Sequence, residues 1–363
     1  MSPIHHNVIA ATTVALLAGA AALIAGPLTP PGGPVGPTYK TLSEVQPARP
    51  VQSLAGSAAA AYVIDQPGSY YLTGNITAIN DRHGIDVVVD NVTIDLCGFT
   101  LDGAGVGYQA IVAGTPTGPI KNLSVVNGVI TNWYMGGIFA SEAPACIFEN
   151  LRFHSLYGAG LQVGPATLVR GCVFNGGQTG IYAEAGVEMV DCSATGATSA
   201  SFWLGDGCSA MRCTAYNAVD AYGFYVWGAN CAIQDCNSRG GFNGIRLAGD
   251  SSRVQRCKIS RAYEGIVANV GSTIIDNTLN SDGTVPSYGI MLFDGQNRVE
   301  GNHLYGFGQG IGMYSNSNVV LSNTMHACTV AISPPTPAWP PLVAPVVNTA
   351  AAVAANPVAN IAQ

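Results

Sequence analysis

The chain has 363 residues, of which 48% are hydrophobic and 10% are charged, and its formal net charge is −7. This composition supplies material for a large core and excludes a disordered chain, while an acidic balance without any Lys/Arg cluster excludes a nucleic-acid-binding footprint. The 45 glycines predict a chain that turns often, because glycine tolerates positive φ and close backbone approach.

Residues 1–26 contain an uncharged, Ala-rich apolar stretch from Val8 to Ala25. A stretch of this kind is typical of an export signal, so we expect a secreted, periplasmic or cell-surface protein. The alternative is an uncleaved membrane anchor, because no Lys or Arg precedes the stretch and no clean small-x-small cleavage site precedes Pro27. Only in that second case is a membrane a partner.

Residues 27–61 are rich in Pro, Gly and Ala and predict an extended leader rather than a domain. At the other end, residues 334–363 form a Pro/Ala-rich tail that begins with closely spaced prolines. This tail is expected either to be disordered or to lie across the end of the fold as a cap.

Between Asn91 and Ser333 one phrase recurs roughly every 21 residues. Its first half ends in Cys or Asn, and its second half is a Gly-apolar step such as Gly244-Ile245. Apolar residues within the phrase alternate with a period of two, which predicts strands too short to be helices. The predicted inward Cys/Asn column comprises Cys97, Asn127, Asn150, Cys172, Cys192, Cys213, Cys236, Cys257, Asn277, Asn302 and Asn323.

These two columns resemble those of right-handed parallel β-helix proteins of the pectate-lyase-like superfamily. The prediction is an all-β fold, a single-stranded right-handed parallel β-helix of about ten to eleven rungs over residues 62–333, with like residues stacked roughly 4.8 Å apart. The resemblance also implies that the segment from Tyr62 to Thr77 is an N-terminal cap strand over the first open coil. It implies no single activity, because the same scaffold hosts lyases, hydrolases, epimerases, tailspikes and adhesins.

Four cysteines form two Cys-x4-Cys pairs, Cys208 with Cys213 and Cys231 with Cys236, a spacing that also occurs in zinc sites. The repeat explains them better as stacked thiols that fill the core, so we expect no metal here. Disulfides are the second alternative. The asparagines that continue the column are expected to hydrogen-bond along it and to turn backbone.

Immediately before that column, charges alternate strictly in sign on successive rungs. We expect these side chains to form a surface ladder of weak ion pairs that opposes register slip, rather than a catalytic carboxylate cluster. The row comprises Asp191, Arg212, Asp235, Arg256 and Asp276.

The clearest functional signal lies on the outward position of the Gly-apolar strand, where three aromatic residues precede an arginine. If the strands stack in register, Tyr182, Trp203 and Tyr225 form a flat strip near 10 Å long that suits a glycan, with Arg246 at its end. Tyr222 and Tyr288 belong to a polar row beside the strip. The alternative is a ladder that only stabilises the sheet, or that a loop or the tail covers.

Two catalytic arrangements fit these residues. Arg246 with Tyr225 fits a uronide lyase, in which an arginine offsets the substrate's carboxylate charge or acts as base. Glu264 with Asp220 fits a glycosidase, in which two carboxylates flank the bond. A third interpretation is that Arg246 and Glu264 form a surface salt bridge.

The motifs of well-known pectinolytic enzymes do not occur. The paired aspartates and Gly-His-Gly segment of polygalacturonases are missing, as are the calcium and arginine motifs of classical pectate lyases, so those roles are not transferred. No cofactor is predicted; calcium at the turn residues Asp206, Asp250 and Asp294 is an alternative to solvated turns.

The sequence therefore predicts an exported β-helix protein that binds or processes a polysaccharide along the aromatic strip, possible chemistries being a polysaccharide lyase or a glycoside hydrolase. The alternative is a noncatalytic cell-surface structural or adhesion protein. The oligomeric state is open.

Overall fold

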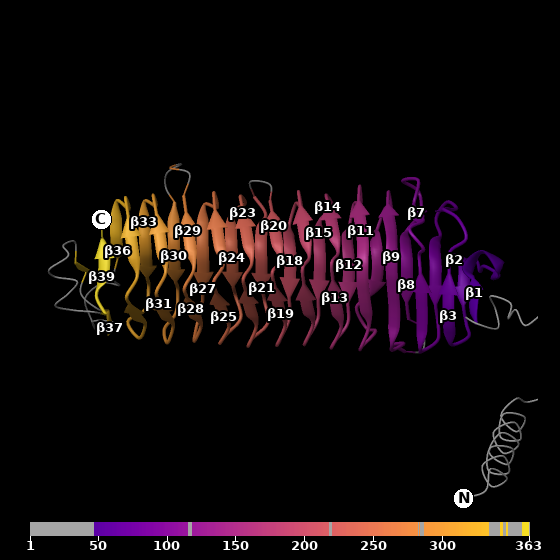
Figure 1. Ribbon diagram of the computed structural model, residues 1–363, viewed down its shortest axis with the longest axis horizontal. Coiled ribbons are helices and arrows are strands. Elements are labelled where there is room, and N and C mark those ends of the chain that lie inside the picture. Colours follow the sequence, from indigo (N-terminus) through magenta and orange to yellow (C-terminus); the bar gives the residue numbers. More distant parts are fainter. Residues whose placement is uncertain are drawn as a thin grey trace, which may run out of the picture. The chain divides into compact units, whose positions relative to one another are not determined.

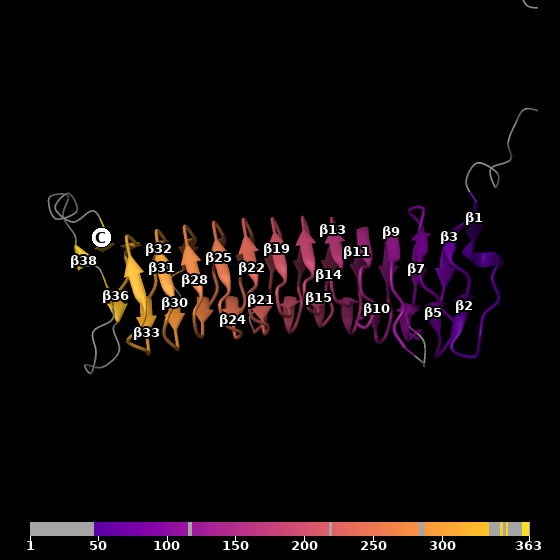
Figure 2. The ribbon, with the colours of Figure 1, turned by 90° about the horizontal axis from the view of Figure 1, so that it is seen from below.

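The computed structural model describes residues 47–114, 118–217, 220–281, 283, 287–333, 342–343, 346–347 and 358–362. From Ala48 onward these residues wind into one coil of short parallel strands, each turn lying beside the next (Figures 1 and 2). Each turn gives one strand to a 13-stranded sheet, and most turns give two to a 26-stranded sheet that bends at a corner. We call the two sides of this corner the first arm and the second arm, in chain order.

The strands of the 13-stranded sheet are β2 (Ala60–Ile64), β5 (His83–Val87), β8 (Gln109–Ala113), β10 (Gly136–Ala140), β12 (Ala159–Val163), β15 (Thr179–Ala183), β18 (Ala200–Leu204), β21 (Tyr222–Val226), β24 (Asn243–Leu247), β27 (Glu264–Ala268), β30 (Tyr288–Leu292), β33 (Gln309–Met313) and β36 (Val330–Ser333).

The first arm consists of β1 (Ala48–Pro50), β3 (Gly68–Tyr71), β6 (Val92–Asp95), β9 (Leu123–Thr131), β11 (Ile147–His154), β13 (Leu168–Arg170), β16 (Glu188–Val190), β19 (Ser209–Met211), β22 (Ala232–Gln234), β25 (Arg253–Gln255), β28 (Thr273–Ile275), β31 (Arg298–Glu300), β34 (Val319–Leu321) and β37 (Leu342–Val343).

The strands β9 and β11 run through the corner into the second arm, which they share with β4 (Ile76–Thr77), β7 (Thr100–Asp102), β14 (Val173–Asn175), β17 (Ser193–Thr195), β20 (Thr214–Tyr216), β23 (Asn237–Arg239), β26 (Lys258–Ser260), β29 (Thr278–Asn280), β32 (His303–Tyr305), β35 (Thr324–His326), β38 (Val346–Val347) and β39 (Asn360–Ala362).

The all-β parallel coil predicted from the sequence is confirmed, but it has 13 turns rather than about ten to eleven. The extra turns are those of β2, β5 and β8, which precede the first recognised step at Gly137-Ile138. Ala61 and Ala110 replace the glycine of the step in β2 and β8, so the pattern weakens there. Figure 1 shows these strands in indigo and purple, continuous with the rest of the coil.

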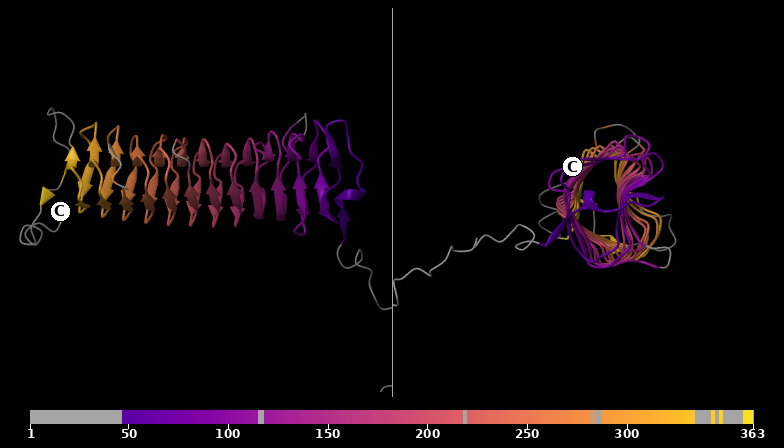
Figure 3. Two further views of the ribbon diagram at one scale, coloured as in Figure 1. Left: turned by 90° about the horizontal axis from the view of Figure 1, so that it is seen from above. Right: turned by 90° about the vertical axis from the view of Figure 1, so that its right-hand side faces the viewer.

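The N-terminal end of the coil differs from the predicted cap. The segment from Tyr62 to Thr77 is part of the first turn, because Tyr62 pairs with Ile85 of the next turn in parallel register. The end is instead closed by η1 (Val51–Ser53), which places the fully buried Val51 in the core. Viewed along the coil, η1 lies inside the opening (Figure 3, right). Residues 48–53, predicted as extended leader, are therefore structured, whereas the predicted signal over 1–26 lies outside the described residues.

The Gly-apolar step exists because the inward side chain of the second arm packs against the backbone of the 13-stranded sheet. A Cβ added to Gly160 would lie 2.5 Å from Cδ1 of Phe174, and one added to Gly289 would overlap Leu304. Such approaches are closer than van der Waals contact allows, so glycine at this position lets the coil keep a large core side chain. Phe153 and Phe174 then stack in the interior, with ring centroids 4.6 Å apart.

The corner between the arms carries two rows, an exposed one with positive φ and a buried one directly after it. Asn127 and Asn150 lie in the exposed row, at φ of 59° and 55°, and not in the buried column where the sequence placed them. The exposed Cys97 also has positive φ. Asparagine is common at positive φ, so it occurs in the exposed row as well as in the buried one. The sequence alignment of the repeats therefore assigned Asn127 and Asn150 to the buried column, although they lie one residue before it.

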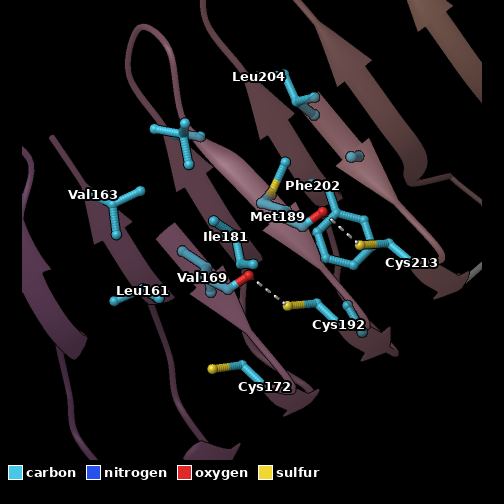
Figure 4. Packing of buried hydrophobic residues seen from close by; sticks show 14 of the residues in the cluster. Leu161, Val163, Val169, Cys172, Ile181, Met189, Cys192, Phe202, Leu204 and Cys213 are labelled. Carbon is cyan, nitrogen blue, oxygen red and sulfur yellow. Dashed lines mark hydrogen bonds between the residues drawn. The ribbon is translucent and has the colours of Figure 1, made fainter. Parts of the chain in front are cut away.

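From Cys172 onward the buried column is as predicted. The five cysteines of this column, the first being Cys172 and the last Cys257, are buried free thiols. Figure 4 shows Cys192 and Cys213 reaching the carbonyl oxygens of Val169 and Met189 in the preceding turn. Asn277, Asn302 and Asn323 follow, and each side-chain oxygen accepts the backbone N–H of the column residue one turn earlier. Asn360 of β39 continues this ladder by accepting the N–H of Asn323, so the described end of the tail packs on the last turn.

Cys208 and Cys231 belong to a second buried column, at the turn that leads from the 13-stranded sheet to the first arm. Their thiols donate to the carbonyl oxygens of Glu184 and Gly205, at 2.7 and 2.9 Å. All ten cysteines are free. Within the described residues no group of three or more His, Cys, Asp or Glu side chains is placed to hold a metal ion.

The alternating charges lie in the exposed corner row, as pairs rather than as a continuous ladder. Arg212 makes a bidentate contact with Asp191, and Arg256 makes one with Asp235, with shortest N–O distances of 2.7 and 2.8 Å. Both pairs are largely exposed, so each stabilises the fold only slightly. Among the described residues, no helix is long and apolar enough to cross a membrane.

Candidate functional site

The aromatic strip consists of Tyr182, Trp203 and Tyr225 on the outer face of β15, β18 and β21. Strand pairing sets them directly opposite one another on successive turns. The ring centroids of Tyr182 and Trp203 are 5.9 Å apart, and those of Trp203 and Tyr225 are 4.4 Å apart. All three side chains are half-buried, so the described residues leave part of each ring open.

The environment of the strip is partly desolvated. Burial raises the pKa of Tyr182, and the nearby charge of Glu184 raises it further. The indole Nε1 of Trp203 is buried and has no hydrogen-bond acceptor among the described residues. An unpaired buried donor costs free energy, so packing alone does not account for a tryptophan at this position.

The strip ends at Arg246, which lies one turn after Tyr225 and directly opposite it in the strand pairing. The two following positions of the row, Val267 and Met291, are buried. The strip is therefore a bounded patch rather than a stripe along the whole coil.

A polar row runs beside the strip, as the sequence predicted. Strand register places Tyr222, Asn243, Glu264, Tyr288 and Gln309 on successive turns. Tyr222 meets Tyr225 edge-on, with centroids 5.0 Å apart, and so widens the strip sideways. Tyr288 lies three turns from Tyr222 and contacts Tyr263 instead, at 6.0 Å, so it is not part of the same surface.

Arg246 is held by neutral partners. Its Nη2 donates to Oδ1 of Asn269 at 3.1 Å, and its Cζ lies 5.2 Å from the ring centroid of Phe293. It forms no ion pair with Glu264, although sequence reasoning placed the two close together. Among the described residues no carboxylate pairs with this guanidinium, which is the condition for attracting an anionic group.

The two candidate carboxylates occupy different surroundings. Glu264 begins β27 and accepts a hydrogen bond from Nδ2 of Asn243 at 2.5 Å. Asp220 is exposed in the turn before β21 and has no hydrogen bond or ion pair with described residues. The turn of Asp220 is two turns from that of Glu264, roughly 10 Å along the coil, and no contact joins the two carboxylates.

Further aromatic residues, which sequence reasoning did not select, lie on the turns of β24 to β33, beyond the strip. Phe242 and Tyr263 stack 5.3 Å apart on the side where the strands begin. Phe293 and Tyr314 stack 5.2 Å apart on the side where they end. Each of the four lies directly before or after a strand of the 13-stranded sheet. Their recurrence at the same positions of the roughly 21-residue phrase is the signal that could have identified them.

The arrangement offers a flat apolar surface, phenol and amide groups beside it, and one unneutralised guanidinium. These features fit a sugar face and an anionic substituent. No described residue makes a hydrogen bond that joins Arg246 to Glu264 or Asp220, so the candidate catalytic groups do not form a single connected cluster.

Comparison with known proteins agrees with this architecture. The family described as "Right handed beta helix region" matches residues 58–219 and 222–333. The fold resembles a tailspike protein of E. coli bacteriophage HK620, with 12% identity over 82% of this chain and 60% of that chain and a TM-score of 0.53. It also resembles the A-module of the mannuronan C-5 epimerase AlgE6 of Azotobacter vinelandii, with 11% identity over 80% of this chain and 88% of that chain and a TM-score of 0.52.

At these identities the likeness shows the fold alone, and the chain spans less than two thirds of the tailspike's length. A comparison with curated proteins finds no match.

Proposed function

We propose that this chain, which belongs to the right-handed β-helix family, is an exported protein that binds a polysaccharide along Tyr182, Trp203 and Tyr225. The observation that carries the proposal is the register of the strip: three half-buried rings on successive turns, followed at once by Arg246. Stacked rings bind the apolar faces of sugars, and the guanidinium suits a carboxylate or sulfate on the chain. The export part of the proposal comes from the apolar stretch between Val8 and Ala25 alone.

The fold comparison supports the class of ligand and supplies no residue roles. The epimerase that shares this fold is, by its name, an enzyme of mannuronan, so in that protein a β-helix acts on a polysaccharide. The strip of the present chain is argued from its own geometry.

Processing of the polysaccharide is the finer proposal. The contact of Arg246 with neutral partners leaves it free to bind an anionic substrate, as in the uronide lyase interpretation. The glycosidase interpretation, with Glu264 and Asp220, has weaker support because the two carboxylates lie about two turns apart. A noncatalytic surface protein that only binds the glycan remains the competing function, and the separation of the candidate groups favours it.

The test incubates the purified chain with acidic and neutral polysaccharides and follows both ultraviolet absorbance and new reducing ends. Absorbance that rises with reducing ends and disappears in Arg246→Ala supports a lyase. Reducing ends alone, lost in Glu264→Ala, support a hydrolase. Saturable binding without cleavage, lost in Trp203→Ala and kept in Tyr134→Ala, supports the binding protein, and no binding to any polysaccharide contradicts the proposal.

A further inference from the structure

The outer face of the second arm carries only cationic and neutral side chains from β11 to β35. We call this the cationic face. Its outward residues include Arg152, His154, Arg239, Lys258, His303 and His326, all of them exposed. None of the outward residues on these strands is Asp or Glu. The chain as a whole has 21 acidic and 14 basic residues, so this face has the opposite charge balance to the protein.

The cations of this face are not neutralised by neighbours. Arg239 and Lys258 form no ion pair within the described residues, whereas arginines of the first arm and the corner pair with Glu149, Glu300, Asp191 and Asp235. The corner row, which precedes the second-arm strands in the chain, carries the carboxylates of Asp235 and Asp276. Asp235 forms an ion pair with Arg256. Asp276 lies one turn beyond Arg256, and its carboxylate is close to Gly301 of the following turn. An anion that binds Arg239 or Lys258 therefore displaces no ion pair among the described residues.

The face is hollowed where these two cations lie. A groove of about 600 Å³ is lined by the side chains of Tyr216, Arg239, Lys258, Asn237, Thr278 and Asn280 and by neighbouring strand residues. The Cζ of Arg239 lies 5.4 Å from the ring centroid of Tyr216, whose side chain is 47% exposed. One ring, two cations and a set of hydroxyl and amide groups therefore line one concave surface.

We propose that this groove is a second binding site, for an acidic polysaccharide, on a different sheet from the aromatic strip. The hydroxyl and amide side chains match sugar hydroxyls, and the two cations match carboxylate or sulfate groups carried on separate sugars. A nucleic acid is a poorer fit. Its phosphates are closely spaced, and their binding relies on many basic contacts, whereas this groove offers two permanent cations over two turns.

This proposal does not depend on the aromatic strip, because no residue is shared between the two sites. If both sites act, one polysaccharide chain or two can bind to different sides of the same coil. Sequence reasoning missed the site because each turn contributes only one cation to it, so no Lys/Arg cluster exists along the chain.

The test measures retardation of the full-length chain in native gels that contain alginate, a polyuronate, or dextran, an uncharged glucan. We expect retardation by alginate that weakens at least about tenfold in Arg239→Gln/Lys258→Gln and that persists in part in Trp203→Ala. Arg253→Gln is the matched control, because Arg253 is an exposed arginine of the first arm whose side chain donates hydrogen bonds to the neutral Gln255. Urea midpoints of all variants verify that they are folded.

Three results would overturn the proposal. Unchanged alginate binding in Arg239→Gln/Lys258→Gln shows that the groove is not the site. Loss of all alginate binding in Trp203→Ala shows that the strip is the single site, which supports the proposed function and rejects this second one. Displacement of bound alginate from the Trp203→Ala variant by a single-stranded oligothymidylate at lower concentration than by alginate itself assigns the groove to nucleic acid.

Discussion

Trp203 lies directly beside Tyr225 on adjacent strands of the 13-stranded sheet, with ring centroids 4.4 Å apart and planes inclined by 36°. Because both are held by strands with a defined register, the surface they form is rigid before any ligand arrives. A preformed surface loses little side-chain entropy on binding, which is the physical advantage of placing a glycan site on a coil of this kind.

Removing the central ring of the strip is expected to weaken glycan binding. Trp203→Ala deletes the ring that contacts both tyrosines, and we expect affinity for the best-bound polysaccharide to fall about tenfold or more, equal to at least about 1.4 kcal/mol. Isothermal calorimetry with a purified oligosaccharide measures the change. Tyr134→Ala removes a 58% exposed ring outside the strip, and equal losses in the two variants would show that the strip has no special role.

Adding one methyl group at the Gly-apolar step is expected to destabilise the coil. In Gly160→Ala the new Cβ meets the ring of Phe174, so the free energy of unfolding should fall by about 1–3 kcal/mol. The same substitution at Gly74, where a Cβ meets nothing within 4 Å, should have little effect. Urea unfolding provides the comparison. In the Phe174→Ala background the cost of Gly160→Ala should become smaller without vanishing, because the added Cβ also lies 2.9 Å from the carbonyl oxygen of Gly180. Additive costs would mean that the steric explanation of the step is wrong.

The asparagine ladder should contribute strongly to stability near the C-terminal end. Asn302→Ala removes the acceptor of the Asn277 N–H, at 3.0 Å, and leaves buried backbone groups without partners. The unfolding free energy should drop by at least about 2 kcal/mol. Asn175→Ala, at an exposed position on β14, should change it by less than about 0.5 kcal/mol. If both variants lowered the free energy of unfolding by a similarly small amount, the asparagine ladder would not be an important source of stability.

The corner ion pairs should stabilise the fold slightly at neutral pH and should lose this contribution in acid. Hydrogen bonds from Arg212 hold the pKa of Asp191 below its ordinary value. A carboxyl group whose folded pKa is depressed stabilises the fold above its unfolded pKa, and this contribution is lost as pH falls through the lower, folded value. In Arg212→Gln the pKa of Asp191 should rise, as followed by carboxyl carbon chemical shifts, while Arg253→Gln should leave it unchanged. An unaltered Asp191 titration in Arg212→Gln would show that the pair does not persist in solution.

The sequence predicted the features that repeat in every turn and missed those that occur once. The Gly-Ile steps predicted the register of the aromatic strip, and that register is what the structure has. Asn127 and Asn150 were placed in the wrong column because positive φ and a buried ladder both favour asparagine. The contact between Arg246 and Phe293 was not predicted, because a long side chain crosses between turns and the repeat does not specify its direction.

The ends of the coil show the same limit. The first turns carry alanine where later turns carry glycine, so β2 and β8 fell outside the recognised repeat. Val51 closes the end of the coil from a single 3-10 turn. This turn is not part of the repeating phrase, so the repeat could not predict it. Candidate catalytic residues could not be ranked either, since the separation of Asp220 and Glu264 depends on which turn each side chain enters.

The measurement that tests the central claim most directly is a crystal structure of the full chain with a bound oligosaccharide from the polysaccharide that binds most tightly. The account predicts a sugar ring stacked on Trp203, with neighbouring contacts to Tyr182 or Tyr225 and an anionic substituent toward Arg246. A glycan bound elsewhere on the coil, with the strip left empty at saturating concentration, would contradict it.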